Sequence, residues 1–81
     1  MDMQEHPVDR ELDITAETCP MTFVRTRLAL DRMASGQLLR VRLKGAEPRA
    51  NVPKTATEQG HAVLACDDQA DGSTLLVIRK N

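Results

Sequence analysis

Residues 17–22 read Glu-Thr-Cys-Pro-Met-Thr, and the helical pattern that follows them runs to Ala34. Proline suits the first position of a helix, because the N–H that it lacks would have no partner inside the helix. Pro20 therefore predicts a helix start and places the sulfur of Cys19 near the positive end of the helix dipole. A thiolate is stabilised there, so we expect Cys19 to have a lowered pKa and to be a reactive, partly exposed sulfur. Pro20, Met21 and Thr22 would form the helix N-terminus that supports it.

Two apolar stripes follow the helix that we expect over residues 20–34. The first has the spacing of one helical face and predicts the side packed on a core; it comprises Phe23, Thr26, Leu30 and Met33. The second begins beside Cys19 and comprises Met21, Val24 and Leu28. Scattered surface hydrophobic residues are common, but an apolar patch near a reactive atom is also typical of a partner-docking surface. Both interpretations stay open, and Gly36 is expected to end the helix region in a left-handed conformation.

The remaining elements follow from alternation and turn signals. Residues 11–14 predict a short first strand. Residues 37–44 predict the clearest strand, since Leu39, Val41 and Leu43 alternate with Arg40, Arg42 and Lys44. A second helix is expected up to Gln59, with Asn51 as its cap and Pro53 in its first turn. Strands are then expected over residues 61–66, with Ala62 and Leu64 on one face, and over residues 73–80.

This order of elements, β-α-β-α-β-β, predicts an α+β fold. The first two strands should be parallel, and the last two should pair in an antiparallel hairpin. We expect a two-layer α/β sandwich, in which two helices cover one face of a four-stranded mixed sheet. Residues 11–81 would form the single domain, and residues 1–10 a flexible N-terminal tail.

The totals exclude several classes of protein. The chain has 81 residues and a formal net charge of −1, which argues against a protein that binds nucleic acid directly. Its one aromatic residue, Phe23, offers almost no platform for base stacking. No apolar run is long enough to span a membrane, and no secretory signal is expected in residues 1–7. Two widely separated cysteines favour free thiols and a cytoplasmic location.

Several other residues have a plain interpretation. Cys66 is expected to fill the core or a strand edge, because free cysteine is among the most buried residue types. His6 and His61 are expected to be solvated, and no metal site is predicted, since no ligand spacing links the cysteines and histidines. Arg25, Arg27 and Arg49 could border a thiolate, but solvated charges are the better interpretation for each.

The segment over residues 12–22, with the helix after it, resembles the TusA/SirA-like family of small sulfur carriers. That family opens with the pattern LD-x-x-G-x-x-CP-x-P on a β-α-β-α-β-β domain, and the residues that match in place here are Leu12, Asp13, Cys19 and Pro20. Residues 49–53 resemble the family's entry into the second helix, and residues 75–80 its last strand. The resemblance covers about residues 11–80.

The resemblance implies that Cys19 accepts a sulfane sulfur as a persulfide and passes it to a partner protein, as a sulfurtransferase rather than a stand-alone enzyme. A donor protein, such as a cysteine desulfurase or a rhodanese, and an acceptor protein are then the implied partners, and no cofactor is required. tRNA thiolation, molybdenum-cofactor maturation and sulfur oxidation all remain open as the pathway. Three positions depart from the pattern: Ala16 replaces a glycine, Glu17 a leucine and Thr22 the second proline.

These departures bear on function more than on fold. Glu17 places a negative charge near the sulfur, which would raise the pKa of Cys19 and oppose the helix dipole. The alternative function is a non-catalytic binding or regulatory module on the same fold, without sulfur relay. A redox enzyme that uses Cys19 is a weaker third candidate, because no resolving cysteine lies nearby in the sequence.

Overall fold

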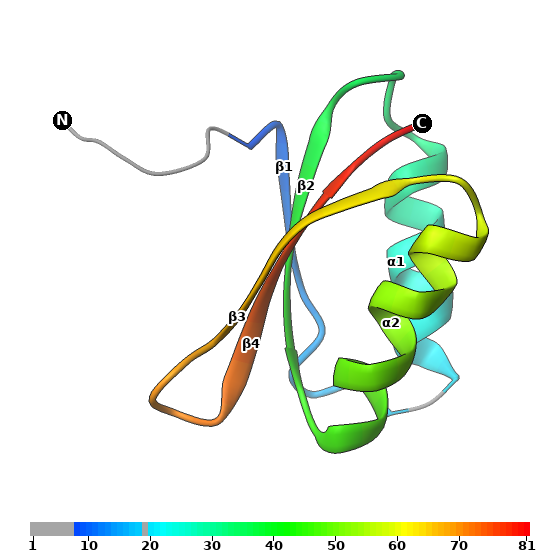
Figure 1. Cartoon of the computed structure of the whole chain (residues 1–81). Coiled ribbons are helices and arrows are strands. Elements are labelled where there is room, and N and C mark those ends of the chain that lie inside the picture. Colours follow the sequence, from blue (N-terminus) through cyan, green and yellow to red (C-terminus); the bar gives the residue numbers. More distant parts are fainter. Residues whose placement is uncertain (1–7, 19) are drawn as a thin grey trace, which may run out of the picture.

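The computed structural model describes residues 8–18 and 20–81. Its six elements follow the predicted order (Figure 1): β1 (Arg10–Asp13), α1 (Met21–Asp31), β2 (Leu38–Lys44), α2 (Ala46–Glu58), β3 (Ala62–Asp68) and β4 (Ser73–Arg79). The strands form one sheet in the order β1-β2-β4-β3. β1 runs parallel to β2, whereas β4 is antiparallel to both β2 and β3.

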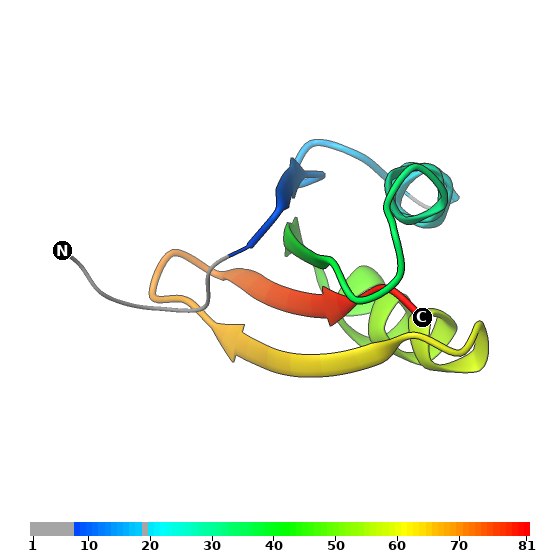
Figure 2. The same ribbon diagram turned by 90° about the horizontal axis from the view of Figure 1, so that it is seen from above.

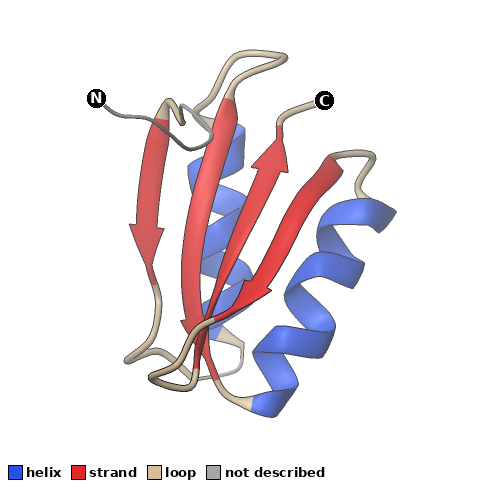
Figure 3. Ribbon diagram, turned by 60° about the vertical axis from the view of Figure 1, so that its left-hand side comes forward, coloured by secondary structure: helices blue, strands red, loops and turns tan. Residues whose placement is uncertain are grey.

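Both helices lie on the same face of the sheet, and its other face is open (Figures 2 and 3). The predicted α+β class, with a four-stranded mixed sheet and two helices on one face, is therefore confirmed. In this arrangement the loop after β1 crosses from the sheet layer to the helix layer, and it delivers the chain to the start of α1 (Figure 2).

The alternation in β2 explains how the sheet is buried. Leu39, Val41 and Leu43 are completely buried on the helix side, where their partners on β4 are Ile78, Leu76 and Thr74. Burying branched aliphatic side chains on one face of a sheet stabilises it by roughly 1.5–3 kcal/mol for each side chain. The basic residues Arg40, Arg42 and Lys44 occupy the open face, as the sequence predicts.

α1 packs on this core through the predicted face. Leu30 and Met33 are buried and Thr26 lies beneath the helix, while Phe23 is only half-buried at the edge of the core. The helix ends at Asp31, before the expected Ala34. The next amides reach back only three residues, since Met33 N–H donates to the Leu30 carbonyl at 3.0 Å. This tighter geometry closes the last turn of many helices.

The start of α2 differs from the prediction. The helix begins at Ala46, directly after Gly45, which has a φ of 111°. Asn51 is therefore not its cap, and Pro53 lies inside the helix rather than in its first turn; Pro48 is the proline near the start. A proline in the first turn removes no intrahelical hydrogen bond, whereas Pro53 leaves the Arg49 carbonyl without its usual amide donor. The sequence offers two suitable prolines, and the turn at Gly45 decides between them.

β3 also differs from the prediction in length and in facing. It extends to Asp68, and its pairing with β4 shifts register between Val63 and Ala65. The extra residue in this bulge is Leu64, which is exposed. A bulge changes which side chains face the core beyond it. Val63 packs against the core before the bulge, and after it Cys66 does so in place of the expected Ala65. β1 begins one residue earlier than expected, at Arg10.

Candidate functional site

The loop between β1 and α1 carries the candidate site. Cys19 itself lies outside the described residues, but the structure describes the residues on both sides of it. The loop starts with a turn that Asp13 holds: its Oδ1 accepts hydrogen bonds from the Thr15 N–H at 2.9 Å and from the Thr15 hydroxyl at 2.7 Å. These bonds, together with the charge of Arg42, lower the pKa of the Asp13 carboxyl. Asp13 therefore stays ionised and fixes the direction in which the chain leaves the sheet.

The first turn of α1 forms around the carbonyl oxygen of Thr18. That oxygen accepts from the Met21 N–H at 2.7 Å and, more weakly, from the Thr22 N–H at 3.3 Å. Pro20 precedes the helix directly and has no N–H to place. The sequence prediction of a helix start at Pro20 is thus correct to within one residue. The N–H groups of Met21 and Thr22 already donate to Thr18. This helix end therefore stabilises an anion through the helix dipole rather than through hydrogen bonds from these two amides.

Glu17 is held by an ion pair with α1. Its Oε2 lies 2.8 Å from Nη1 of Arg25, and both side chains are partly exposed. The negative charge that the sequence places two residues before Cys19 is therefore partly neutralised by a cation one turn into the helix. The sequence offered no signal for this pair, because the two residues are eight positions apart and belong to different elements.

Thr22 occupies an unusual environment for a polar residue. It is 1% exposed, and its hydroxyl oxygen has no hydrogen-bond partner among the described residues. Its carbonyl oxygen accepts a hydrogen bond of 2.8 Å from the hydroxyl of Thr26, one turn later. The residue that stands where the resembling family has its second proline is therefore a buried helix residue under the first turn of α1.

The second apolar stripe of α1 faces outward. Met21, Val24 and Leu28 are 43%, 40% and 49% exposed, which is high for large apolar side chains. The prediction that this stripe lies away from the core is confirmed. It starts at the first residue of the helix and runs along it for two turns, so it forms an apolar surface next to the loop that carries Cys19.

The other arginines considered from the sequence have structural partners. Arg27 lies 4.0 Å from Asp31 on α1. Arg49 on α2 donates to the Asp68 carboxylate at the end of β3 from both Nε, at 2.8 Å, and Nη2, at 3.1 Å. The hydrogen bonds that Arg49 donates to Asp68 raise the pKa of its guanidinium, and the nearby Cys66 adds to this effect. Both arginines are exposed charges with acidic partners, and the Arg49 pair joins α2 to β3.

Cys66 is half-buried on β3 and packs against the core. The prediction that it fills the core edge is confirmed. His61 precedes β3 and its Nδ1 accepts a hydrogen bond of 3.1 Å from the N–H of Asn81. It is therefore partly buried rather than fully solvated, and His6 lies outside the described residues.

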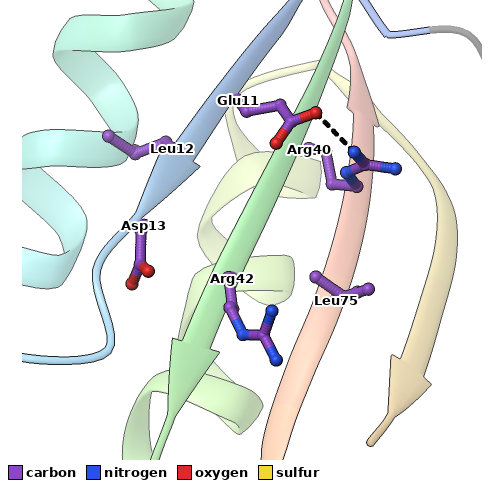
Figure 4. Close-up of a pocket in the computed structure, with 6 residues that line it drawn as sticks. All are labelled: Glu11, Leu12, Asp13, Arg40, Arg42 and Leu75. Atoms are coloured by element: carbon purple, nitrogen blue, oxygen red, sulfur yellow. Dashed lines mark hydrogen bonds and ion pairs between the residues drawn. The ribbon is translucent and has the colours of Figure 1, made fainter.

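A shallow pocket of about 400 Å³ lies on the open face of the sheet, across β1 and β2 (Figure 4). Arg40 and Arg42 point into it, and Arg40 is hydrogen-bonded to Glu11. Arg42 donates to Asp71 at 3.0 Å. Because each arginine already has a carboxylate partner, this pocket presents balanced charges.

Within residues 8–18 and 20–81, no cluster of three or more histidine, cysteine, aspartate or glutamate side chains could hold a metal ion. In the same part of the chain, no helix is long and apolar enough to cross a membrane.

The fold has a close counterpart among solved structures. The crystal structure of a SirA-like protein from Desulfitobacterium hafniense superposes with a TM-score of 0.76. The match covers 86% of this chain and 95% of that one, at 21% sequence identity. This likeness concerns the fold.

Sequence comparison reaches further. A relative from Archaeoglobus fulgidus, named "Putative sulfur carrier protein", is 36% identical over 69 residues, which are 85% of this chain and 78% of the relative. A relative of the same name from Thermotoga maritima is 32% identical over 82% of this chain and 84% of its own length. The protein TsuB of Escherichia coli, which carries the same description, is 26% identical over 90% of this chain and 97% of its own.

All three relatives are named as sulfur carriers. The model of the family described as "Sulfurtransferase TusA" matches residues 10–80, which is every element from β1 to β4. The resemblance seen in the cysteine–proline segment thus extends over the whole domain, and the chain belongs to the TusA family.

Proposed function

We propose that this protein is a sulfur carrier that accepts a sulfane sulfur as a persulfide on Cys19 and passes it to a partner protein. One observation carries the proposal: in a chain of the TusA family, a cysteine directly before a proline stands at the junction of β1 and α1. The only other cysteine, Cys66, packs against the core and is a poor candidate for exchange between proteins.

The chemistry consists of two displacements at sulfur. First, the Cys19 thiolate attacks the outer sulfur of a donor persulfide, so that a bond forms between the two sulfurs, the donor S–S bond breaks, and the donor leaves as a thiolate. Then a thiolate of the acceptor attacks the outer sulfur on Cys19, and Cys19 leaves as a thiolate. Each step exchanges one S–S bond for another, so no external oxidant, reductant or metal is needed. The rates depend on the thiolate fraction and on access to the sulfur.

The surroundings of the loop suit this chemistry. The positive end of the α1 dipole favours the thiolate both as attacking group and as leaving group. Arg25 offsets the opposing charge of Glu17 through their ion pair. The helix N-terminus, with Pro20 as the preceding residue and Met21 and Thr22 as the first two helical ones, supports the thiolate through this dipole, since the Met21 and Thr22 amides already bond to Thr18.

Transfer between proteins also needs a docking surface. The stripe of Met21, Val24 and Leu28 is exposed and begins beside the loop, and burial of such a surface is the usual driving force of protein association. We propose that donor or acceptor proteins, such as a cysteine desulfurase or a rhodanese, dock on this stripe in the cytoplasm.

The test is sulfur loading. The reduced protein is incubated with a cysteine desulfurase and cysteine, and its intact mass is measured with and without reductant. We expect a gain of one sulfur atom that reductant removes, absent in Cys19→Ser and present in the matched variant Cys66→Ser. Loading on Cys66, or no loading from a desulfurase, a rhodanese or a small persulfide, contradicts the proposal and favours the binding-module alternative. That alternative is retained because Thr22 replaces the second proline.

A further inference from the structure

We propose that the groove between α1 and the free edge of β1 binds an extended, acidic segment of a partner protein, which adds to the sheet as a strand beside β1. The groove has a volume of about 370 Å³, and one of its lining residues, Arg25, is paired with Glu17 in the loop that carries Cys19. The inference rests on the proposed function, because it names the chemistry of a partner that would exchange sulfur with Cys19.

The backbone of β1 has one unpaired edge. β1 pairs with β2 in the described sheet and is its terminal strand. The Ile14 N–H donates to the Arg42 carbonyl at 2.8 Å, so the backbone of Ile14 faces β2. Successive residues of a strand in a parallel pair turn their N–H and C=O to opposite sides. The backbone groups of Glu11 and Asp13 therefore face away from β2, where a further strand could bond to them.

The opposite edge of the sheet is less suited to accept a strand. β3 carries the bulge at Leu64, which interrupts its regular hydrogen-bonding pattern. Its last residue, Asp68, is engaged by Arg49 and by the Thr74 hydroxyl. Bulges and charged residues are the usual means by which proteins protect an edge strand. The register of β1 with β2 contains no such irregularity.

The side chains of the groove select the charge of the occupant. Arg10, Arg25 and Arg32 line it and are exposed. Arg25 is paired with Glu17, and no ion pair within the described part of the chain involves Arg10 or Arg32. The one acidic residue of the lining, Glu11, is bonded to Arg40 on the open face (Figure 4). The groove therefore offers cationic groups to carboxylates of a partner.

The floor of the groove is apolar and suits an extended segment. Leu12 is half-buried, Ala29 is buried and Leu28 is 49% exposed, and together they form an apolar surface between the strand edge and the helix. An added strand presents alternate side chains to opposite sides. Arg10 and Leu12 lie on the helix side of β1, opposite Leu39 and Val41. The side chains of an added strand that face α1 would therefore meet the floor and the arginines together, with aliphatic residues on the floor and acidic residues at the arginines. A helix in the groove would leave the β1 edge unbonded.

The groove is continuous with the proposed docking stripe. Leu28 belongs to both surfaces, and it lies seven residues, about 10 Å of helix rise, from Met21 at the start of α1. A partner held by a strand at β1 would therefore be positioned with its adjacent surface near the loop that carries Cys19.

The test uses the full chain with Cys19→Ser, so that sulfur chemistry plays no part. The probe is a capped ten-residue peptide in which every second residue is threonine and the residues between them alternate between glutamate and valine, so that one side of the strand carries both. The control peptide has lysine in place of glutamate. In an amide NMR titration we expect saturable shifts at residues 10–13, 28 and 32, slower hydrogen exchange of the Glu11 and Asp13 amides, and weaker binding at higher salt. Arg10→Glu and Arg32→Glu should each weaken binding about tenfold, whereas Lys54→Glu on α2 should leave it unchanged.

A matched pair of variants tests the added strand. Glu11→Pro removes an N–H that faces away from β2, which an edge strand tolerates, while Glu11→Ala keeps that N–H. We expect binding to be lost in the proline variant and kept in the alanine variant, with thermal unfolding showing that both fold. If the proline variant does not fold, protection of the Glu11 amide in the Cys19→Ser chain decides instead.

Several results would overturn the inference: no shifts at residues 10–13 with 1 mM peptide, equal binding of the lysine peptide, or equal binding by the two Glu11 variants. Sulfur loading of Cys19 from a small persulfide needs no docked partner, so it is measured independently of the groove. Loading without peptide binding would overturn this inference alone, and peptide binding without loading would overturn the proposed function and leave an acidic-segment binding module.

Discussion

The guanidinium of Arg25 on α1 lies 2.8 Å from the carboxylate of Glu17, in the loop between β1 and α1. This pair connects the residue two places before Cys19 to the second turn of the helix. It places a cation next to the acidic charge that would otherwise oppose formation of a thiolate. The charge balance around the candidate nucleophile thus depends on a contact between two elements.

We predict that neutral substitutions of Arg25 and of Glu17 shift the pKa of Cys19 in opposite directions. Arg25→Gln leaves the Glu17 charge uncompensated and should raise the pKa of the thiol by about half a unit, and Glu17→Gln should lower it by a similar amount. The measurement is the rate of iodoacetamide alkylation of Cys19 between pH 5 and 9, in a Cys66→Ser background. Arg27→Gln is the control, since its partner is Asp31 at 4.0 Å. Unchanged profiles in both variants would show that the pair does not act on the sulfur.

We predict that the exposed stripe on α1 matters for transfer and not for folding. Val24→Glu and Leu28→Glu place a charge on an apolar surface that a partner would cover, so transfer of sulfur should fall at least about tenfold. Mass spectrometry of the acceptor after mixing with loaded protein provides the measurement. Leu64→Glu on β3 is the matched control, because Leu64 is similarly exposed, at 44%. Normal transfer by folded Val24→Glu and Leu28→Glu would remove the docking role of the stripe.

Local patterns in the sequence predict most of the fold. The alternation over residues 37–44 identifies β2 and its buried face, and the helical spacing of Thr26, Leu30 and Met33 identifies the packed side of α1. Both patterns arise because one face of each element is buried, so the apolar positions in the sequence identify the buried face. The open face of the sheet, with Arg40 and Arg42, follows from the same alternation.

Features that depend on contacts between elements could not be read from the sequence. The turn at Gly45 sets the start of α2. From the sequence, either Pro48 or Pro53 could lie in the first turn, and a start at Pro53 made Asn51 the expected cap. The bulge at Leu64 depends on the register between β3 and β4. At the candidate site, the cysteine and the stripe were visible as local signals, whereas the pairing of Glu17 with Arg25 and the burial of the Thr22 hydroxyl were not.

We predict that stability decreases as His61 becomes protonated. Burial lowers the pKa of His61 below 6.5, and the charge of Lys80 adds to this effect. The unfolded chain therefore binds a proton more readily than the folded one, so the stability is present above about pH 6.5 and declines as the pH falls through the folded pKa. The urea midpoint at pH 7.5 and 5.5 measures this. His61→Gln should flatten the difference, and an equal difference in the variant would assign it to other groups.

We predict a second loss of stability in acid that involves Asp71. The hydroxyl and the N–H of Ser73 donate to its carboxylate, at 2.6 and 2.9 Å. These bonds, with that from Arg42, lower the pKa of Asp71 to about 2. A depressed carboxyl pKa stabilises the fold above the unfolded value, so this contribution is lost between about pH 4 and pH 2. Asp71→Asn should reduce the acid dependence of the thermal midpoint in that range. Asp31→Asn is the control, and the same reduction there would contradict the assignment.

We predict that Thr22→Val stabilises the protein. The Thr22 hydroxyl is buried and has no hydrogen-bond partner among the described residues, and such a group costs roughly 1–3 kcal/mol. Valine keeps the shape and removes the polar atom, so the free energy of unfolding in urea should rise by about 1 kcal/mol. Thr26→Val is the matched control, because it removes a hydroxyl that donates to the Thr22 carbonyl at 2.8 Å, and it should not stabilise.

The same variant connects this hydroxyl to function. If Thr22 serves only as a helix residue, Thr22→Val should load sulfur on Cys19 at the wild-type rate. A stabilised variant that loads slowly would show that the Thr22 hydroxyl acts in sulfur loading. A functional role is one reason why a protein keeps a buried polar group that has no hydrogen-bond partner in the fold. A destabilised variant would instead show that the Thr22 hydroxyl has a hydrogen-bond partner in solution, which would contradict the prediction.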